Sequence, residues 1–544
     1  MGTATADETV TPTVTPTVTT TVTTKQGTVR GRIVDGLRIT LGIPYAAPPF
    51  GAGRFQAPLP AEAWDGVRDC TRFGPVAPQS AELPGAPAWR PGQEDVLSLN
   101  IWSPTDAPGP LPVLFWIHGG AYTFGSSAQP DYDGAALARA GLTVVSCNYR
   151  LGFEGFGHVP AHPDNRGLLD QIAALEWVRD NISAFGGDPD DVTVAGQSAG
   201  GGSIACLMST ARAEGLFHRA IAHSVPDATF PPGLAASLAH EVAAEAGVAP
   251  TAEGLLSATP QALVEASDRV VARYAADPSS GPLHYDTVIY GPVLDGALLT
   301  KDPLDALAAG SGGEVDLLVC HATEEYWLMH EVGSMPPATT PEGLHRFAAA
   351  YGLPPAILAR YQALMPGAPV LDVYLAVAGD AVFTTHTVRL AEAHARAGGR
   401  AFLSRFDRRR TRPDGSPVRA WHAADVPFAL GTLDAEGVDF LTGGPADEDD
   451  RALSRRMVRA WAEFATRGEP GWAPLTDPAD PLVHVWDVPV DREEGASLAH
   501  ALWRDLRAVP LPPCPPPPSP LPPSPPSTDA TRPHPDEASR PATG

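Results

Sequence analysis

Short apolar runs and longer helical stretches alternate through the first half of the chain. Four runs have the length and composition of buried strands, near residues 97–102, 112–117, 142–147 and 192–196. An amphipathic helix is predicted over residues 167–183, where one apolar face repeats at helical spacing: Leu168, Ile172, Leu175 and Val178. Strands that alternate with helices favour a mainly parallel sheet covered by helices on both faces.

Two further patterns extend this picture toward both ends of the fold. Residues 27–40 contain two short alternating runs separated by Asp35-Gly36, which predicts a β-hairpin. Residues 227–285 and 335–400 are rich in alanine and leucine and are predicted to be mostly helical.

The two ends of the chain have compositions unlike a packed core. Residues 1–25 are rich in Thr and Val and predict a disordered or extended leader, without the basic and apolar regions of a signal peptide. Residues 509–544 are dense in proline and predict a disordered tail of polyproline II character, which packs no core. We expect residues 26–508 to form a single folded domain.

Charge and cysteine content narrow the environment and the partners. The formal net charge of −25 disfavours nucleic acid and anionic membranes, because both are bound by basic surfaces. The five cysteines show no paired spacing, and no run of 18 apolar residues is present. We therefore expect a cytoplasmic protein without a transmembrane helix, although the sequence leaves secretion open.

The pentapeptide Gly-Gln-Ser-Ala-Gly at residues 196–200 is the strongest candidate for a chemical site. The preceding residues, 192–195, are of strand type, and residues 201–210 are of helix type. A serine between glycines at a strand-to-helix turn is typical of a nucleophile elbow, which exposes the hydroxyl beside a helix N-terminus. The pattern predicts attack of Ser198 on an acyl carbonyl.

Three other segments fit the same chemistry. His118-Gly119-Gly120-Ala121 directly follows an apolar strand. Hydrolases with a nucleophile elbow place the amides of their oxyanion hole at such a position. An apolar strand at residues 317–323 ends in two carboxylates, Glu324 and Glu325. His422 lies in a late loop segment, residues 419–428. The order serine, acid, histidine is that of an α/β-hydrolase.

These motifs and several others resemble the type-B carboxylesterases, the family of bacterial carboxylesterases, para-nitrobenzyl esterases and cholinesterases. The resemblance covers about residues 26–505. It is most specific at Gly-Leu-Leu-Asp-Gln (167–171) and Ala-Phe-Gly-Gly-Asp-Pro (184–189), and it continues at residues 42–46, 94–95, 99–102, 148–152, 174–178, 291–296 and 461–465. It implies an α/β-hydrolase fold, with helical insertions over the active site and residues 26–508 as one catalytic domain.

The resemblance also implies an activity and roles for individual residues. It implies a serine carboxylesterase that hydrolyses carboxylic esters to acid and alcohol through an acyl-enzyme. Ser198 is the expected nucleophile and His422 the expected base. Glu325 is favoured over Glu324 as the acid, because the second carboxylate of the motif is the catalytic one in the family.

The oxyanion hole implied by the resemblance consists of three backbone amides, those of Gly120, Ala121 and Ala199. Neither a cofactor nor a metal ion is expected. The expected partner is a small-molecule ester, with no nucleic acid and no membrane, and a monomer is favoured.

Several positions depart from the family pattern. Gln197 stands where the family usually has glutamate, so a negative charge near the histidine is missing. Residues 224–226 read Ser-Val-Pro where relatives have Ser-Gly, and residues 320–322 read Cys-His-Ala. Two pairs match buried ion pairs of the family, Arg54 with Glu94 and Arg150 with Asp170.

Two other functions stay open at this point. One is a non-catalytic, cholinesterase-like binding protein, but such members lack a triad residue, whereas this chain has all three candidates. The other is a hydrolase of carbamates, amides or lactones, which the same triad supports because these substrates also pass through a covalent enzyme intermediate.

Overall fold

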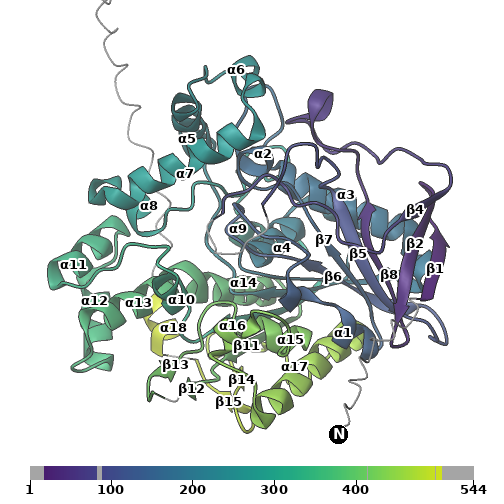
Figure 1. Cartoon of the computed structure of the whole chain (residues 1–544). Coiled ribbons are helices and arrows are strands. Elements are labelled where there is room, and N and C mark those ends of the chain that lie inside the picture. The colour runs from purple at the N-terminus through teal and green to yellow at the C-terminus, as the bar shows by residue number, and fades with distance from the viewer. Residues whose placement is uncertain (1–17, 82–87, 413, 497, 505–544) are drawn as a thin grey trace, which may run out of the picture.

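A large twisted sheet forms the centre of the molecule (Figure 1). The computed structural model describes residues 18–81, 88–412, 414–496 and 498–504. In this part of the chain the main sheet has thirteen strands in the order β1-β2-β3-β5-β7-β6-β8-β9-β10-β11-β14-β15, with β4 paired to β2.

The strands of the main sheet and of a small separate hairpin have the following bounds: β1 (Val18–Thr23), β2 (Thr28–Val34), β3 (Leu37–Pro44), β4 (Val67–Asp69), β5 (Ser98–Pro104), β6 (Leu111–Ile117), β7 (Thr143–Cys147), β8 (Gly187–Gln197), β9 (Arg219–His223), β10 (Asp316–Ala322), β11 (Ala401–Phe406), β12 (Arg410–Thr411), β13 (Pro417–Val418), β14 (Val483–Trp486) and β15 (Arg492–Glu494). The four strands predicted from apolar runs are therefore present as β5, β6, β7 and β8.

The helices have the following bounds: α1 (Ala135–Arg139), α2 (Gly152–Phe156), α3 (Arg166–Asn181), α4 (Ala199–Ser209), α5 (Pro232–Glu245), α6 (Ala252–Ser257), α7 (Pro260–Ala276), α8 (Pro282–Tyr285), α9 (Pro303–Ala308), α10 (Trp327–Glu331), α11 (Pro341–Ala350), α12 (Pro355–Leu364), α13 (Val370–Gly379), α14 (Thr385–Arg396), α15 (Val426–Leu430), α16 (Val438–Thr442), α17 (Glu448–Arg467) and α18 (Leu498–Trp503). The amphipathic helix predicted over 167–183 is α3, and both regions predicted to be mostly helical are so.

The middle of the sheet is parallel. Strands β7, β6, β8, β9, β10, β11 and β14 all run in one direction, and antiparallel strands flank them on both sides. Parallel strands need both faces covered. Alternate residues of β6 accordingly enter two different cores, with Phe115 on one side and Trp116 on the other.

Helices supply the other half of each core. Side chains of α3, α4 and α14 pack on the face that includes Phe115, whereas α1 and α17 pack on the face that includes Trp116. Trp116 is thus a core residue that contacts Trp461 and Tyr132. The predicted α/β class and the helices on both faces are confirmed.

The hairpin predicted at residues 27–40 is present as β2 and β3. Its turn is Asp35-Gly36, with φ angles of 48° and 76°. Positive φ at both central residues suits the twist of a two-residue hairpin, which explains why Asp-Gly occupies this turn.

The sheet begins earlier than the composition suggests. Residues 18–23, within the range assigned to a leader, form β1 and pair with β2 in antiparallel register. The alternating Thr and Val of this segment are β-branched and suit a sheet edge. Residues 1–17 and the proline-rich range 509–544 lie outside the described residues.

One of the two expected ion pairs forms, and the other has a different acid. Arg150 and Asp170 are buried with a 2.7 Å contact. Arg54 pairs with Glu154 at 2.6 Å and not with Glu94, which is exposed. The buried helix α2 carries Glu154 into the interior, where a carboxylate needs a cation.

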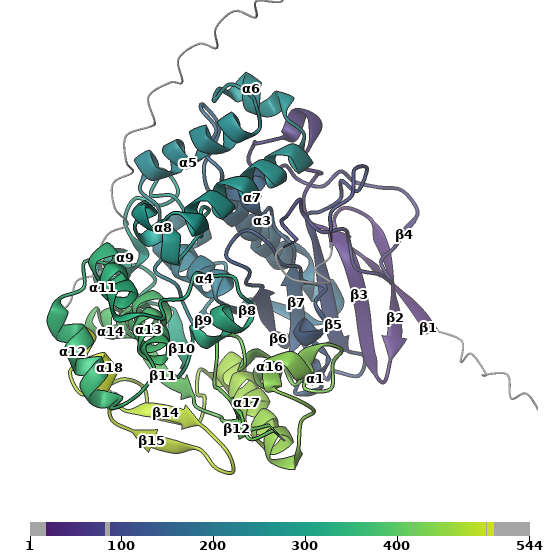
Figure 2. The same cartoon turned by 60° about the vertical axis from the view of Figure 1, so that its left-hand side comes forward.

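The inserted helices gather on one side of the molecule. Figures 1 and 2 place α5–α8 and α11–α13 away from the edge formed by β1, β2 and β4. In the described part of the chain, no helix is both long and apolar enough to cross a membrane.

Candidate active site

The candidate site lies at the carboxyl ends of the parallel strands. Ser198 follows β8, and Glu325 follows β10 by three residues. His422 lies in the loop between β13 and α15. Because parallel strands end at one edge of the sheet, these three segments meet there, although more than 220 residues separate the serine from the histidine.

Ser198 has the backbone geometry of a sharp strand-to-helix turn. It precedes α4 with φ 57° and ψ −126°, an unusual conformation for a residue with a side chain. Its amide donates to the His223 carbonyl at 2.9 Å, and its carbonyl accepts from Gly202 at 2.9 Å. The strain is held by bonds on both sides of the residue, as strained functional residues require.

The glycines of the pentapeptide are required by close packing. A Cβ on Gly196 would lie 2.8 Å from the Ile117 carbonyl oxygen, and one on Gly200 would collide with the same group. The turn can therefore approach β6 only if both flanking residues lack side chains. The predicted elbow is present in shape, with the serine at the first turn of α4.

Glu325 and His422 form a buried hydrogen-bonded pair. His422 Nδ1 donates to Glu325 Oε2 at 2.6 Å, and the His422 amide donates to the Glu325 carbonyl at 3.2 Å. His422 is 5% exposed and Glu325 is 1% exposed. This contact fixes the imidazole with its proton on Nδ1 and leaves Nε2 as an acceptor.

The two adjacent carboxylates have different partners. Glu325 accepts hydrogen bonds from Ser224 Oγ and from the Ala322 amide, both at 2.7 Å. Glu324 instead contacts Arg419 at 2.7 Å. The structure therefore brings Glu325, and not Glu324, to the histidine.

Gln197 is hydrogen-bonded to Nε2 of His422, the ring nitrogen that does not contact Glu325. Its side-chain Nε2 lies 3.0 Å from His422 Nε2 and donates to it. Among the described residues, this amide and not the Ser198 hydroxyl is the hydrogen-bonded partner of His422 Nε2. Attack by the serine therefore requires the amide to yield this acceptor to Ser198 Oγ.

The predicted oxyanion amides have free donors. Gly120 and Ala121 have φ angles of 113° and 49°, and within the described chain nothing accepts from their N–H groups. Ala199 is the first residue of α4, where amides lack an acceptor within the helix. Ala121 and Ala199 line one cavity together with Ser198.

Four residues of the site have roles that the sequence motifs did not indicate. Ser224 donates to Glu325, although the sequence marks its segment only as a departure from the family pattern. Phe383 lies over the His422 ring, with centroids 4.3 Å apart. His223 and Asp425 form a second buried pair, in which Nδ1 and Oδ2 are 2.5 Å apart. No motif signals these contacts, because each joins segments far apart in the chain.

The other histidines near the site have different surroundings. His321, which lies beside the acid, contacts the Ala322 carbonyl at 3.1 Å, and burial lowers its pKa to about 4. His386 lies on α14, as the helical pattern predicts, and faces Asp227 at 3.8 Å. Neither histidine is hydrogen-bonded to Glu325.

One group of side chains has the composition of a metal site. Among the described residues, the possible ligand atoms of His223, Cys320 and Asp425 lie within 4.8 Å of one another. Two ligands of one tetrahedral metal ion are about 3.4 Å apart. The His223–Asp425 distance of 2.5 Å is much shorter, so this geometry fits a hydrogen-bonded pair and not two ligands of one ion.

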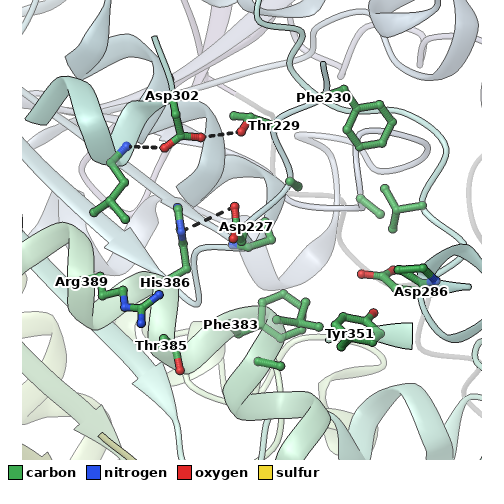
Figure 3. Close-up of a pocket in the computed structure, with 18 of the residues that line it drawn as sticks. Asp227, Thr229, Phe230, Asp286, Asp302, Tyr351, Phe383, Thr385, His386 and Arg389 are labelled. Atoms are coloured by element: carbon green, nitrogen blue, oxygen red, sulfur yellow. Dashed lines mark hydrogen bonds and ion pairs between the residues drawn. The ribbon is translucent and has the colours of Figure 1, made fainter. Parts of the chain in front are cut away.

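Ser198 lines a large cavity, and Figure 3 shows other residues of its wall. Its volume is about 960 Å³, and its wall is formed by the insertions as well as by the strand ends. Tyr122 lines it, as do Phe230, Leu283, Tyr326 and Val382. The wall of this cavity thus combines apolar side chains with charged groups such as Asp227, Asp286 and Arg389.

The chain is similar to known esterases over most of its length. The model of the family described as "Carboxylesterase family" matches residues 18–351 and 357–488. The para-nitrobenzyl esterase of Bacillus subtilis (strain 168) is 36% identical over 462 residues, which cover 83% of this chain and 90% of that protein. The fumonisin B1 esterase of Sphingopyxis macrogoltabida is 36% identical over 449 residues, 79% of each chain.

Solved structures give the same result. A carboxylesterase of Geobacillus stearothermophilus has a TM-score of 0.77 and 34% sequence identity to this chain. The match covers 89% of this chain and 99% of that structure. The similarity therefore extends over most of the fold.

Proposed function

The chain belongs to the carboxylesterase family and is a carboxylic ester hydrolase, and from this premise we propose that Ser198, His422 and Glu325 are its catalytic triad. The observation that carries the proposal is the convergence of a strained serine and a buried Glu–His pair at one edge of the sheet. Glu325 rather than Glu324 is the acid, because only Glu325 contacts the imidazole.

Acylation begins at the serine hydroxyl. His422 Nε2 accepts the proton of Ser198 Oγ while the oxygen attacks the ester carbonyl, and a tetrahedral oxyanion forms. The imidazolium then donates this proton to the leaving alcohol as its C–O bond breaks. The products of this half are an acyl-enzyme on Ser198 and the free alcohol.

Deacylation repeats the same steps with water. His422 accepts a proton from water, the hydroxide attacks the acyl carbonyl, and the proton returns to Ser198 Oγ as the acid leaves. Glu325 stabilises the imidazolium in both halves and keeps the tautomer with Nδ1 protonated. Ser224 and the Ala322 amide hold Glu325 in place.

The oxyanion is stabilised by the amides of Gly120, Ala121 and Ala199. Each such donor contributes about a hundred- to a thousandfold in rate. Because the backbone N–H supplies the stabilisation, alanine at position 121 retains this function.

Substitution of the nucleophile tests the proposal. We expect Ser198→Ala to lower kcat for p-nitrophenyl acetate by about four orders of magnitude or more, since the covalent step is lost. The assay is release of p-nitrophenol, with circular dichroism to establish folding. Glu324→Gln is the matched control for Glu325→Gln, and only the latter is expected to lose activity. Full activity in Ser198→Ala would exclude Ser198 as the nucleophile.

We also propose that the enzyme is a cytoplasmic monomer with a single catalytic domain that includes β1. The four described cysteines are buried free thiols, which suits a reducing compartment. Cell fractionation and size-exclusion chromatography test location and oligomeric state. Recovery of the enzyme only from the medium would contradict the first, and elution as a dimer would contradict the second.

A further inference from the structure

The helices α13 and α14 are joined by a π-helical turn, residues 380–384, and not by a loop. In this turn the Thr385 amide donates to the Asp380 carbonyl, five residues earlier in the chain. Gly379 and Thr384 keep right-handed helical angles, so the helix continues through the turn. A π-helical turn contains one residue more than an α-helical turn and is frequent at functional sites.

The π-helical turn lies against the proposed base and acid. Phe383 of the turn lies over the His422 ring, with centroids 4.3 Å apart and ring planes 35° apart. Phe383 is 5% exposed and lines the cavity (Figure 3). Just before the turn, a Cβ on Gly379 would lie 3.3 Å from the Glu325 Cβ. The placement of the turn therefore decides what packs on one face of the imidazole.

The side chain of Asp380 fixes the turn to a neighbouring helix. Its carboxylate accepts a hydrogen bond from the Tyr361 hydroxyl of α12. Burial raises the pKa of Asp380 to about 6, and hydrogen bonds from Tyr361 and Thr384 lower it in part. Burial, followed by the charge of Asp380, raises the pKa of Tyr361, so the phenol keeps its proton. At pH 8 the bond joins a neutral donor to an ionised acceptor, which is stronger than a bond between neutral groups.

The helix α18 contacts the same tyrosine. Trp503 Nε1 donates to the Tyr361 hydroxyl oxygen at 2.8 Å, and both side chains are buried. The Trp503 carbonyl accepts from Arg389 at 2.6 Å, and His500 contacts Glu392 at 2.7 Å, so α18 is also attached to α14. The Tyr361 hydroxyl therefore accepts a bond from α18 and donates one to the π-helical turn.

We propose that a hydrogen-bonded set outside the triad positions its base: Asp380, Tyr361 and Trp503. The set acts through Phe383, because it holds the turn that places this ring on His422. Contact with the ring limits tilting of the imidazole while its Nε2 accepts and returns the proton of the nucleophile, and loss of this alignment slows both halves of the reaction. The inference rests on the proposed function, because it takes His422 as the base.

Removal of one hydroxyl tests the set. We expect Tyr361→Phe to lower kcat for p-nitrophenyl acetate at pH 8 about five- to tenfold, with KM within about twofold. Tyr374→Phe is the matched control, because Tyr374 is buried in the same cluster and its hydroxyl donates to the Pro336 carbonyl at 3.2 Å. Both variants lose a buried hydrogen bond and are expected to unfold at a lower temperature than wild type. Only Tyr361→Phe is expected to lose kcat.

Two further comparisons follow the effect along the set. Asp380→Asn keeps an acceptor oxygen for Tyr361, so it is expected to retain more of the wild-type kcat than Asp380→Ala does. Phe383→Leu removes the ring that transmits the effect. In a protein that carries Phe383→Leu, we therefore expect Tyr361→Phe to lower kcat by less than about twofold further.

Four outcomes would overturn the inference. These are a wild-type kcat in Tyr361→Phe, an equal loss of kcat in Tyr374→Phe, an Asp380→Asn variant no more active than Asp380→Ala, and the full effect of Tyr361→Phe in the presence of Phe383→Leu. Failure of the proposed function gives a different result, since Ser198→Ala would then hydrolyse p-nitrophenyl acetate as fast as wild type.

Discussion

Gln197 is the residue whose contact most changes the expected chemistry. The sequence marks it as a missing negative charge near the histidine, and the structure adds that its amide donates to His422 Nε2 at 3.0 Å. An amide in this position stabilises the neutral imidazole, because it donates to the nitrogen that must later carry the proton. A carboxylate at the same position would stabilise the protonated imidazole instead.

The Gln197→Glu variant tests this effect through the pH dependence of kcat/KM. The new carboxylate favours the protonated histidine and so raises its pKa. As the pH falls, the imidazole is therefore protonated earlier, and we expect the acid limb of the profile to move up by about one pH unit. Gln197→Met, which has similar size, removes the donor without adding a charge and is expected to move the limb up by less than Gln197→Glu does. A profile that is the same in all three proteins would show that position 197 does not influence the base.

At the scale of elements, the ends of β8 and β9 hold the loop that carries the base. Gln197 ends β8 and contacts His422, and its register neighbour His223 ends β9 and contacts Asp425. The carbonyl of His223 also accepts from the Ser198 amide. His223 of β9 therefore connects the turn at Ser198 with the loop that contains His422.

Loss of the His223–Asp425 contact is expected to affect turnover more than substrate binding. We expect Asp425→Ala to lower kcat about tenfold with KM within about twofold, because the loop that carries His422 loses an anchor and leaves His223 buried without an acceptor. His223→Gln keeps a side-chain donor for Asp425, and this variant is expected to retain most of the wild-type kcat. Steady-state kinetics and thermal unfolding of both variants make the comparison.

A purely structural role would give another pattern. In that case Asp425→Ala would lower the midpoint of thermal unfolding while kcat of the folded fraction stayed at the wild-type value. Equal kcat in wild type and Asp425→Ala would therefore contradict the proposed connection.

At the scale of the whole molecule, the sheet extends into the segment that composition assigns to a leader. All six residues of β1 pair with β2, and they cover an edge that would otherwise be open. The predicted domain boundary at residue 26 thus cuts through the described sheet.

Two N-terminal deletions distinguish the boundaries. Removal of residues 1–17 is expected to leave the midpoint of thermal unfolding unchanged within about 1 °C. Removal of residues 1–23 also deletes β1 and is expected to lower it by about 2–4 °C, because the backbone pairs with β2 are lost. Differential scanning calorimetry of both proteins gives the comparison. Equal midpoints would show that β1 contributes nothing to stability.

The sequence by itself determined the parts of this protein that depend on local pattern. The strands β5–β8, the helix α3 and the Asp35-Gly36 turn follow from apolar spacing and turn chemistry. The resemblance to a family predicts Ser198 as the nucleophile and His422 as the base. These features can be predicted because each depends on residues that are neighbours in the sequence, as the turn at Ser198 depends on the glycines beside it.

Only the tertiary structure decided which distant groups meet. The choice of Glu325 over Glu324, the partner of Arg54, the Gln197–His422 contact and the His223–Asp425 pair each join segments tens to hundreds of residues apart. Local pattern cannot predict such contacts, since they depend on the register of adjacent strands and on where the loops after them return. The chemistry of the site is thus encoded locally, whereas its geometry and its charge balance arise from packing at one edge of the sheet.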